Sequence, residues 1–191
     1  MVDAPKNIED PLALFETFTK DTTWWGSRTE HLQTLPNGFE KWLATEWLLW
    51  IGADQKLDRA RIGTEYKATL ESADTGEHSR EQKQIDLWWA VDDPTKGPWN
   101  YVELKVVFNN ANRKKVFTSA GWDLSYLSRL ARSERPHFRA IVVVGSGFID
   151  ESPWNEGVTW VTEASGRIVE PGLGGTLGTL RWQGWSLPPE R

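Results

Sequence analysis

The chain contains no cysteine among its 191 residues, and it has only three histidines. Without cysteine it can form neither a disulfide framework nor a thiolate metal site. His31, His78 and His137 lack the spacing of metal ligands. No apolar run approaches the roughly 18 residues of a membrane-spanning helix, and no secretory signal follows Met1. We therefore expect a cytoplasmic protein with no membrane partner.

The formal net charge is -5, which argues against a surface coated with basic residues for binding nucleic acid. The charge is nevertheless uneven along the chain. Between Lys105 and Arg139 there are eight basic residues and two acidic ones. A local basic patch of this kind is what phosphate binding requires.

The length predicts a single domain, residues 1–191, because domains usually contain roughly 100–200 residues. Asp10-Pro11 predicts the start of a helix to about Lys20. A stronger helix is expected from Asn37, in capping-box spacing with Glu40, to about Ile51. Both helices carry apolar residues at helical spacing.

The middle of the chain alternates between strand and helix signals. Three successive strands are predicted, over 62–70, around Asp86 and around Glu103. A long helix is expected from Asn112 through Arg132, followed by a buried strand over 140–144 that pairs in parallel with a neighbour. The predicted class is therefore α/β, with a mixed sheet flanked by helices in the order α-β-β-β-α-β. The core spans residues 37–146, and residues 147–191 form an extension of loops and short strands such as Thr159–Thr162 and Leu180–Trp182.

Three charged residues lie inside two apolar strands, and they are the anomaly that a function must explain. Asp86 interrupts one run, and Glu103 and Lys105 interrupt the next. Residues two apart on a strand share a face, so Glu103 and Lys105 are neighbours. An antiparallel turn between the strands places Asp86 nearly opposite Glu103. Unpartnered charges in such a place cost several kcal/mol, so a partner, a metal or an opening to solvent is expected.

Glu46 is a fourth unusual charge, because it falls on the apolar stripe of the 37–51 helix. Two adjacent carboxylates repel unless a cation lies between them. Magnesium prefers oxygen ligands, and Asp86, Glu103 and a nearby main-chain carbonyl, that of Leu104, would supply them. Lys105 could then orient the attacking water or stabilise charge developing on phosphorus.

Asp86 followed by Glu103-Leu104-Lys105, in this order of elements and after a helix carrying Glu46, resembles the PD-(D/E)xK nuclease superfamily. That superfamily includes type II restriction enzymes and archaeal Holliday junction resolvases. The resemblance covers about residues 37–145. Ile85 stands where the motif has proline.

The resemblance implies a restriction-endonuclease-like core and a magnesium-dependent endonuclease that hydrolyses DNA. It assigns metal ligation to Asp86 and Glu103, with support from Glu46, and a water-orienting role to Lys105. Manganese should substitute for magnesium. Making two cuts in a duplex also favours a homodimer in related enzymes.

Further residues bear on substrate binding. Arg113, Lys114 and Lys115 begin the helix after the Glu103 strand, where acids are usually preferred, and phosphate contact would explain their presence. A solvated helix face is the alternative. Trp24-Trp25, Trp154 and Trp185 are the tryptophans expected to expose faces for stacking.

Four alternatives stay open. Glu65-Tyr66-Lys67 repeats the E-x-K pattern, but its upstream acids lie in a polar stretch, so Glu103 and Lys105 are favoured. Glu103 and Lys105 could also form an ordinary cross-strand ion pair. The chain could be a catalytically inactive module that binds nucleic acid or protein on the same scaffold, or a carbohydrate-active protein with paired carboxylates.

Overall fold

The computed structural model describes residues 10–25, 39–54, 57, 60–71, 82–93, 95–148 and 150–189. Its elements, in chain order, are α1 (Pro11–Lys20), α2 (Thr22–Trp25), α4 (Phe39–Asp54), β1 (Ile62–Thr69), β2 (Gln82–Asp93), β3 (Gly97–Phe108), α5 (Arg113–Leu127), the 3-10 helix η1 (Arg132–Glu134), β4 (Pro136–Ser146), α6 (Glu151–Ala164), β5 (Gly174–Leu177) and β6 (Leu180–Leu187). No helix in these described ranges is long and apolar enough to cross a membrane.

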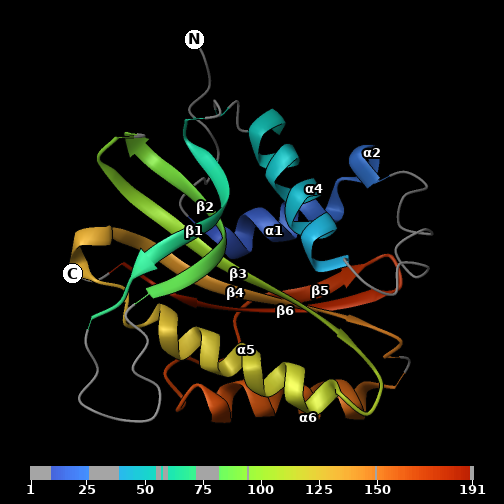
Figure 1. Ribbon diagram of the computed structural model, residues 1–191. Helices are drawn as coiled ribbons and strands as arrows, with labels where there is room; N and C mark the ends of the chain where they lie inside the picture. The colour runs from blue at the N-terminus through green and yellow to red at the C-terminus, as the bar shows by residue number, and fades with distance from the viewer. Residues whose placement is uncertain are drawn as a thin grey trace.

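One six-stranded mixed sheet, in the order β1-β2-β3-β4-β6-β5, runs through the molecule (Figure 1). The strands β1, β2 and β3 form an antiparallel meander. The strands β3 and β4 pair in parallel, with the long helix α5 in the connection between them. The α/β class, the meander and the parallel pair are thus confirmed.

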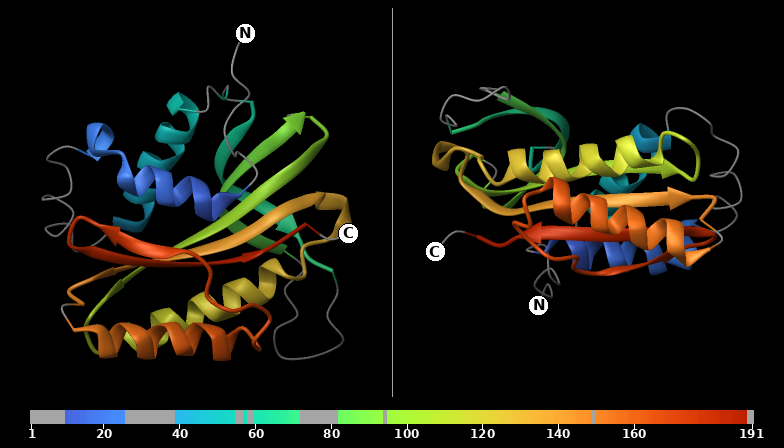
Figure 2. Two further views of the ribbon diagram at one scale, coloured as in Figure 1. Left: turned by 180° about the vertical axis from the view of Figure 1, so that it is seen from behind. Right: turned by 90° about the horizontal axis from the view of Figure 1, so that it is seen from below.

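Helices cover both faces of the sheet (Figure 2). The helices α1 and α4 pack on one face, and α5 and α6 pack on the other. Alternation along β3 divides its side chains between these layers: Val102 and Leu104 join the α1/α4 core, whereas Tyr101 and Val107 join the α5/α6 core. Glu103 and Lys105 therefore lie on the α5 face of β3, although both are charged.

The predicted helices are present with different limits. The carboxylate of Asp10 caps α1 by accepting a hydrogen bond of 2.9 Å from the Leu12 amide. The predicted cap of α4, Asn37, lies outside the described residues. The helix α5 begins after Asn112 as expected but ends at Leu127, before the predicted Arg132. A turn and η1 follow, and β4 already begins at Pro136.

The prediction for residues 147–191 was wrong in one part. Thr159–Thr162 lies inside the helix α6, not in a strand. Pro153 and Gly157 are typical of loops, but proline is tolerated in the first helical turn and Gly157 is needed for close packing. A Cβ at Gly157 would collide with the Phe117 ring of α5. The predicted strand around Leu180 does exist, as β6, and it pairs with β4 inside the main sheet.

Most of the tryptophans expected to be exposed are buried. Trp25, Trp154 and Trp185 are at most 6% exposed, so they serve packing. Gly and Pro neighbours indicated exposure wrongly, because small residues also allow a large ring to pack closely. At Gly145, for example, a Cβ would collide with the Trp154 ring. Trp122, on α5, is 52% exposed.

Candidate active site

The candidate site lies where β2 and β3 separate. The two strands pair from Leu87 and Val102 toward their connecting turn, and this register places Asp86 opposite Glu103, as predicted. Beyond that point the structure records no β2–β3 pair in the described residues, and β2 pairs there with β1. The edge of β3 that faces β2 is consequently open from Glu103 onward.

Two carboxylates take the place of a paired strand along this edge. Asp86 Oδ2 accepts a hydrogen bond of 2.9 Å from the Leu104 amide. Glu40, from the first turn of α4, accepts one of 3.1 Å at Oε2 from the Val106 amide. A residue paired on one side of an antiparallel strand directs its N–H and its C=O to the same side, so the Leu104 carbonyl also faces the open edge. These contacts bring two acid groups and a main-chain carbonyl to one short stretch of backbone.

On the α5 face of the same stretch, four charges form a nearly buried network. Lys83 Nζ lies 3.1 Å from Glu103 Oε1 and 2.9 Å from Asp123 Oδ1. Lys105 Nζ lies 3.6 Å from Glu103 Oε2 and 3.2 Å from Asp123 Oδ2. The two acids and the two lysines thus alternate. Glu103 is 1% exposed and Lys105 is 17% exposed, so water screens these contacts little.

Glu103 is incompletely satisfied inside this network. Its Oε1 is buried without a hydrogen-bond partner in the described structure, so the 3.1 Å contact with Lys83 is an ion pair of poor hydrogen-bond direction. Burial raises the pKa of Glu103 well above 4.5, and the negative charge of Asp86 raises it further, against the opposing effect of Lys83. The site therefore favours a proton, or another positive charge, at Glu103.

The acids of the open edge and those of the network influence one another. Burial raises the pKa of Glu40, and Asp86 and Asp123 add to the increase, whereas Lys105 opposes it. The pKa of Lys105 is raised, because Glu103, Asp123, Glu40 and Asp86 together outweigh its burial. Four carboxylates face two ammonium groups here, an excess of two negative charges when all are ionised. A divalent cation would neutralise that excess.

The sequence matches no protein-family model, no curated protein and no solved structure. The chemistry of the site must therefore be judged from its own residues.

The donor set suits a hard cation, but the conformation described does not assemble it. Asp86, Glu103, Glu40 and the Leu104 carbonyl all supply oxygen, the atom that magnesium and manganese prefer. No group of three or more acidic or histidine side chains in the described residues is arranged to hold an ion. Asp86 is bonded to an amide, and Glu103 lies between lysines. The Leu104 amide occupies one oxygen of the Asp86 carboxylate, and the other oxygen is the one that could bind a cation without loss of this contact.

Glu46 lies apart from this group. Its Oε2 accepts a hydrogen bond of 3.1 Å from the indole nitrogen of Trp24, and its side chain is half-buried. The helix acid that interacts with Asp86 and Lys105 is Glu40, which is six residues earlier on α4. Six residues along a helix amount to about 9 Å, so the two acids serve different surroundings.

Glu65, from the second E-x-K pattern of the chain, also lies near Asp86. Thr64 pairs with Leu87 and Tyr66 with Ile85, so Glu65 is opposite Asp86 where the ladder is interrupted. Its φ of 57° places it in the left-handed region, an unusual conformation for glutamate. Together with Asp86 and Glu40, Glu65 lines a cavity of about 140 Å³, where its carboxylate pairs with Lys41 at 3.2 Å.

The three basic residues begin α5 as predicted. Arg113 pairs with Glu156 of α6 at 3.4 Å, and Lys114 Nζ lies 5.4 Å from the centre of the Trp160 ring. Lys114 and Lys115 are exposed. Arg113 and Lys114 therefore also contribute to the packing of α5 against α6, which explains part of their presence without any nucleic acid.

Sequence reasoning missed Lys83, Asp123 and the role of Glu40. A signal existed for Asp123, because it falls among Ala120, Leu124 and the other buried residues of α5. An acid on a buried helix face calls for a partner in the same way as Glu46 did. Lys83 gave no comparable signal, because it follows a polar loop in the sequence.

Proposed function

We propose that the protein is a metal-dependent phosphodiesterase that cleaves DNA at the open edge of β3. The observation that carries the proposal is the position of two edge carboxylates, Asp86 and Glu40, beside Glu103 and Lys105, in a group with more carboxylates than ammonium groups. Paired carboxylates that face a lysine suit a reaction in which a cation and an ammonium group share the charge of a phosphate.

The residues of the site would have different roles. Asp86, Glu103, Glu40 and the Leu104 carbonyl would hold the cation, which supplies positive charge to the phosphate oxygens when bound. Lys105 would donate a hydrogen bond to a non-bridging phosphate oxygen, where negative charge grows during the reaction.

Asp123 is a positioning residue, because its contact of 3.2 Å holds the Lys105 ammonium group. Lys115, exposed at the start of α5, offers a contact to a neighbouring phosphate. The same groups would act on RNA, and DNA is the substrate proposed here because of the resemblance to DNA nucleases.

Cleavage of supercoiled plasmid with magnesium or manganese tests this function. Asp86→Asn and Lys105→Ala should each lower the cleavage rate by about 10²–10³-fold, the usual effect of losing one group that stabilises the transition state. Asp92→Asn is the matched control, because Asp92 is an exposed acid on the same strand. Equal rates for the wild type, Asp86→Asn and Asp92→Asn would refute the proposal.

A second candidate function is nucleic-acid binding without cleavage. The favouring observation is the engagement of both catalytic candidates of β3: Glu103 with Lys83, and Lys105 with Asp123. This alternative expects DNA binding that is independent of divalent cations. A gel-shift titration with and without manganese separates the two, because only the phosphodiesterase gains affinity or activity from the metal.

A further inference from the structure

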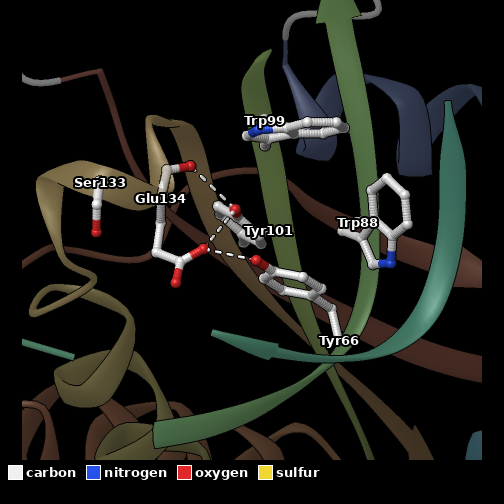
Figure 3. Close-up of a pocket in the computed structure, with 6 residues that line it drawn as sticks. All are labelled: Tyr66, Trp88, Trp99, Tyr101, Ser133 and Glu134. Atoms are coloured by element: carbon white, nitrogen blue, oxygen red, sulfur yellow. Dashed lines mark hydrogen bonds between the residues drawn. The ribbon is translucent and has the colours of Figure 1, made fainter. Parts of the chain in front are cut away.

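A second hollow lies on the α5 face of the sheet, beside the charge network. Tyr66 of β1, Trp88 of β2, Trp99 and Tyr101 of β3, and Ser133 and Glu134 of η1 line a pocket of about 150 Å³ (Figure 3). Tyr101 precedes Glu103 by two residues on the same face of β3. Nothing in the proposed hydrolysis uses these rings.

The aromatic walls stand at steep angles to one another. Trp88 and Trp99 are 5.3 Å apart at 74°, and Tyr66 and Trp88 are 6.0 Å apart at 56°. In Figure 3 Trp99 lies above the hollow, Tyr66 below, Trp88 to one side and Glu134 to the other, with Tyr101 behind. Rings at these angles border a concave hollow and not a flat slot.

The two nearly parallel rings of the pocket, Tyr66 and Tyr101, leave no room for a flat ring between them. Tyr66 and Tyr101 lie 5.9 Å apart at 24°. A planar base inserted between two rings needs about 7 Å, twice the ordinary carbon contact distance. The stacked pair therefore forms a closed wall of the pocket and leaves no slot for a base.

Glu134 contributes the one carboxylate among the lining residues. Its Oε1 accepts a hydrogen bond of 2.7 Å from the Thr69 amide, and its Oε2 accepts one of 2.8 Å from the Tyr66 hydroxyl. The Tyr101 hydroxyl donates to the Glu134 carbonyl at 3.0 Å and lies 3.5 Å from Oε2. These donors occupy much of the capacity of the carboxylate to accept further hydrogen bonds.

Glu134 also affects the pKa of its neighbour Tyr66. Burial and the contact with Glu134 raise the pKa of Tyr66 to about 12, so the hydroxyl stays a donor at neutral pH. The guanidinium of the adjacent Arg135 donates to the Lys96 carbonyl at 2.8 Å. The pocket thus combines aromatic faces with a carboxylate, and its own residues occupy much of the hydrogen-bonding capacity of that carboxylate.

We propose that this pocket binds a quaternary ammonium group. Such a cation interacts with aromatic faces through their negative quadrupole, gains from a nearby carboxylate and has no N–H that would need an acceptor. A primary ammonium, with three N–H donors, would lose its hydration shell and find fewer free acceptors than it has donors. The group could belong to a choline-type small molecule or to a trimethylated lysine side chain, which present the same chemistry.

Isothermal titration calorimetry of the full chain with four probes tests the proposal. The probes are choline, its neutral carbon isostere 3,3-dimethylbutan-1-ol, ethanolamine and adenosine. Choline should bind at least about tenfold more tightly than the isostere and ethanolamine, since a desolvated cation–aromatic contact and one carboxylate are worth this much. Equal affinity for choline and the isostere, or binding of adenosine without choline, would overturn the proposal.

Variants identify the site. Glu134→Gln, which keeps an acceptor for the Thr69 amide, and Trp99→Leu, which keeps an apolar side chain, should each weaken choline binding about tenfold. Trp122→Leu is the matched control, because Trp122 is exposed on α5 outside the pocket. Circular dichroism and thermal melting establish that each variant is folded. Unchanged choline affinity in a folded Glu134→Gln variant contradicts the assignment.

A second titration distinguishes the sources of the cation. A peptide that contains trimethyllysine is compared with the same peptide containing unmodified lysine. Preference for the trimethylated peptide over free choline identifies a side chain as the source, and the reverse identifies a small molecule. Failure of both ligands to bind refutes the proposal, whatever the plasmid assay shows, because the pocket is separate from the cleavage site.

Discussion

Replacing Lys83 with methionine would test the buried charge network directly. Methionine keeps most of the volume of lysine but removes its charge, so Glu103 and Asp123 share Lys105 alone. Removing one partner of a buried ion pair costs about 3–5 kcal/mol. For a chain of 191 residues each kcal/mol lowers the melting temperature by roughly 2–4 °C, so a decrease of roughly 6–20 °C is expected.

A second substitution distinguishes loss of charge balance from loss of packing. In the double variant Lys83→Met/Glu103→Gln, Lys105 and Asp123 remain as one balanced pair, so most of the lost stability should return. Urea denaturation of the two single variants and the double variant gives the coupling free energy, expected to exceed about 1 kcal/mol for groups in contact.

The pH dependence provides a further check on the same variant. Without Lys83 the pKa of Glu103 rises further, and each added pKa unit corresponds to about 1.4 kcal/mol. Protonation relieves the uncompensated charge, so Lys83→Met should cost less stability at pH 5 than at pH 8. If the loss were independent of pH, or if Glu103→Gln failed to restore stability, the network would not hold the charges that we assign to it.

Three further predictions concern the rest of the molecule. Because the folded protein holds a proton on Glu103 more tightly than the unfolded chain, stability should fall as pH rises from about 4.5 through the raised pKa, and Glu103→Gln should flatten this slope in urea denaturation; an unchanged slope contradicts the assignment. Gly157→Ala should lower the free energy of unfolding by about 1–3 kcal/mol, because its Cβ would collide with Phe117. Gly52→Ala should stabilise α4 slightly, because its Cβ meets nothing nearer than 3.9 Å. Thermal melting compares the two variants, and equal effects refute the packing argument. Lys115→Ala should reduce the salt dependence of DNA binding by about 0.9 in the log–log slope, measured by fluorescence anisotropy, and an unchanged slope removes Lys115 from the interface.

The sequence was sufficient to predict the order of the elements from α4 to β4 and the central register. Apolar runs, turn residues and the period-2 pattern of β3 are local signals, and they located the meander, α5 and the parallel strand. The opposition of Asp86 and Glu103 followed from the midpoint of the turn alone. The α6 helix was missed because Gly157 is typical of a loop. Its place in a helix is explained by its close contact with the Phe117 ring, which is forty residues away in the sequence.

The candidate site was predicted only in part, because one of its contacts depends on how α4 packs on the sheet. Asp86, Glu103 and Lys105 stood out because each interrupts an apolar strand. Which acid of α4 reaches them depends on the rotation of that helix over the sheet, and this rotation selects Glu40 and turns Glu46 toward Trp24. Glu40 and Glu46 each lie three residues from the buried Leu43, on opposite sides of it, so helical periodicity alone could not make this choice.

Calorimetric titration of manganese into the wild type and Asp86→Asn tests the central claim most directly. The account predicts saturable binding near neutral pH in the wild type, a loss of at least about tenfold in affinity in Asp86→Asn, and wild-type affinity in Asp92→Asn. Binding should weaken at lower pH as Glu103 and Glu40 take up protons, since the pKa of each is raised. Absence of binding in the wild type, or equal affinity in Asp86→Asn and Asp92→Asn, would contradict the assignment of a cation site to the open edge of β3.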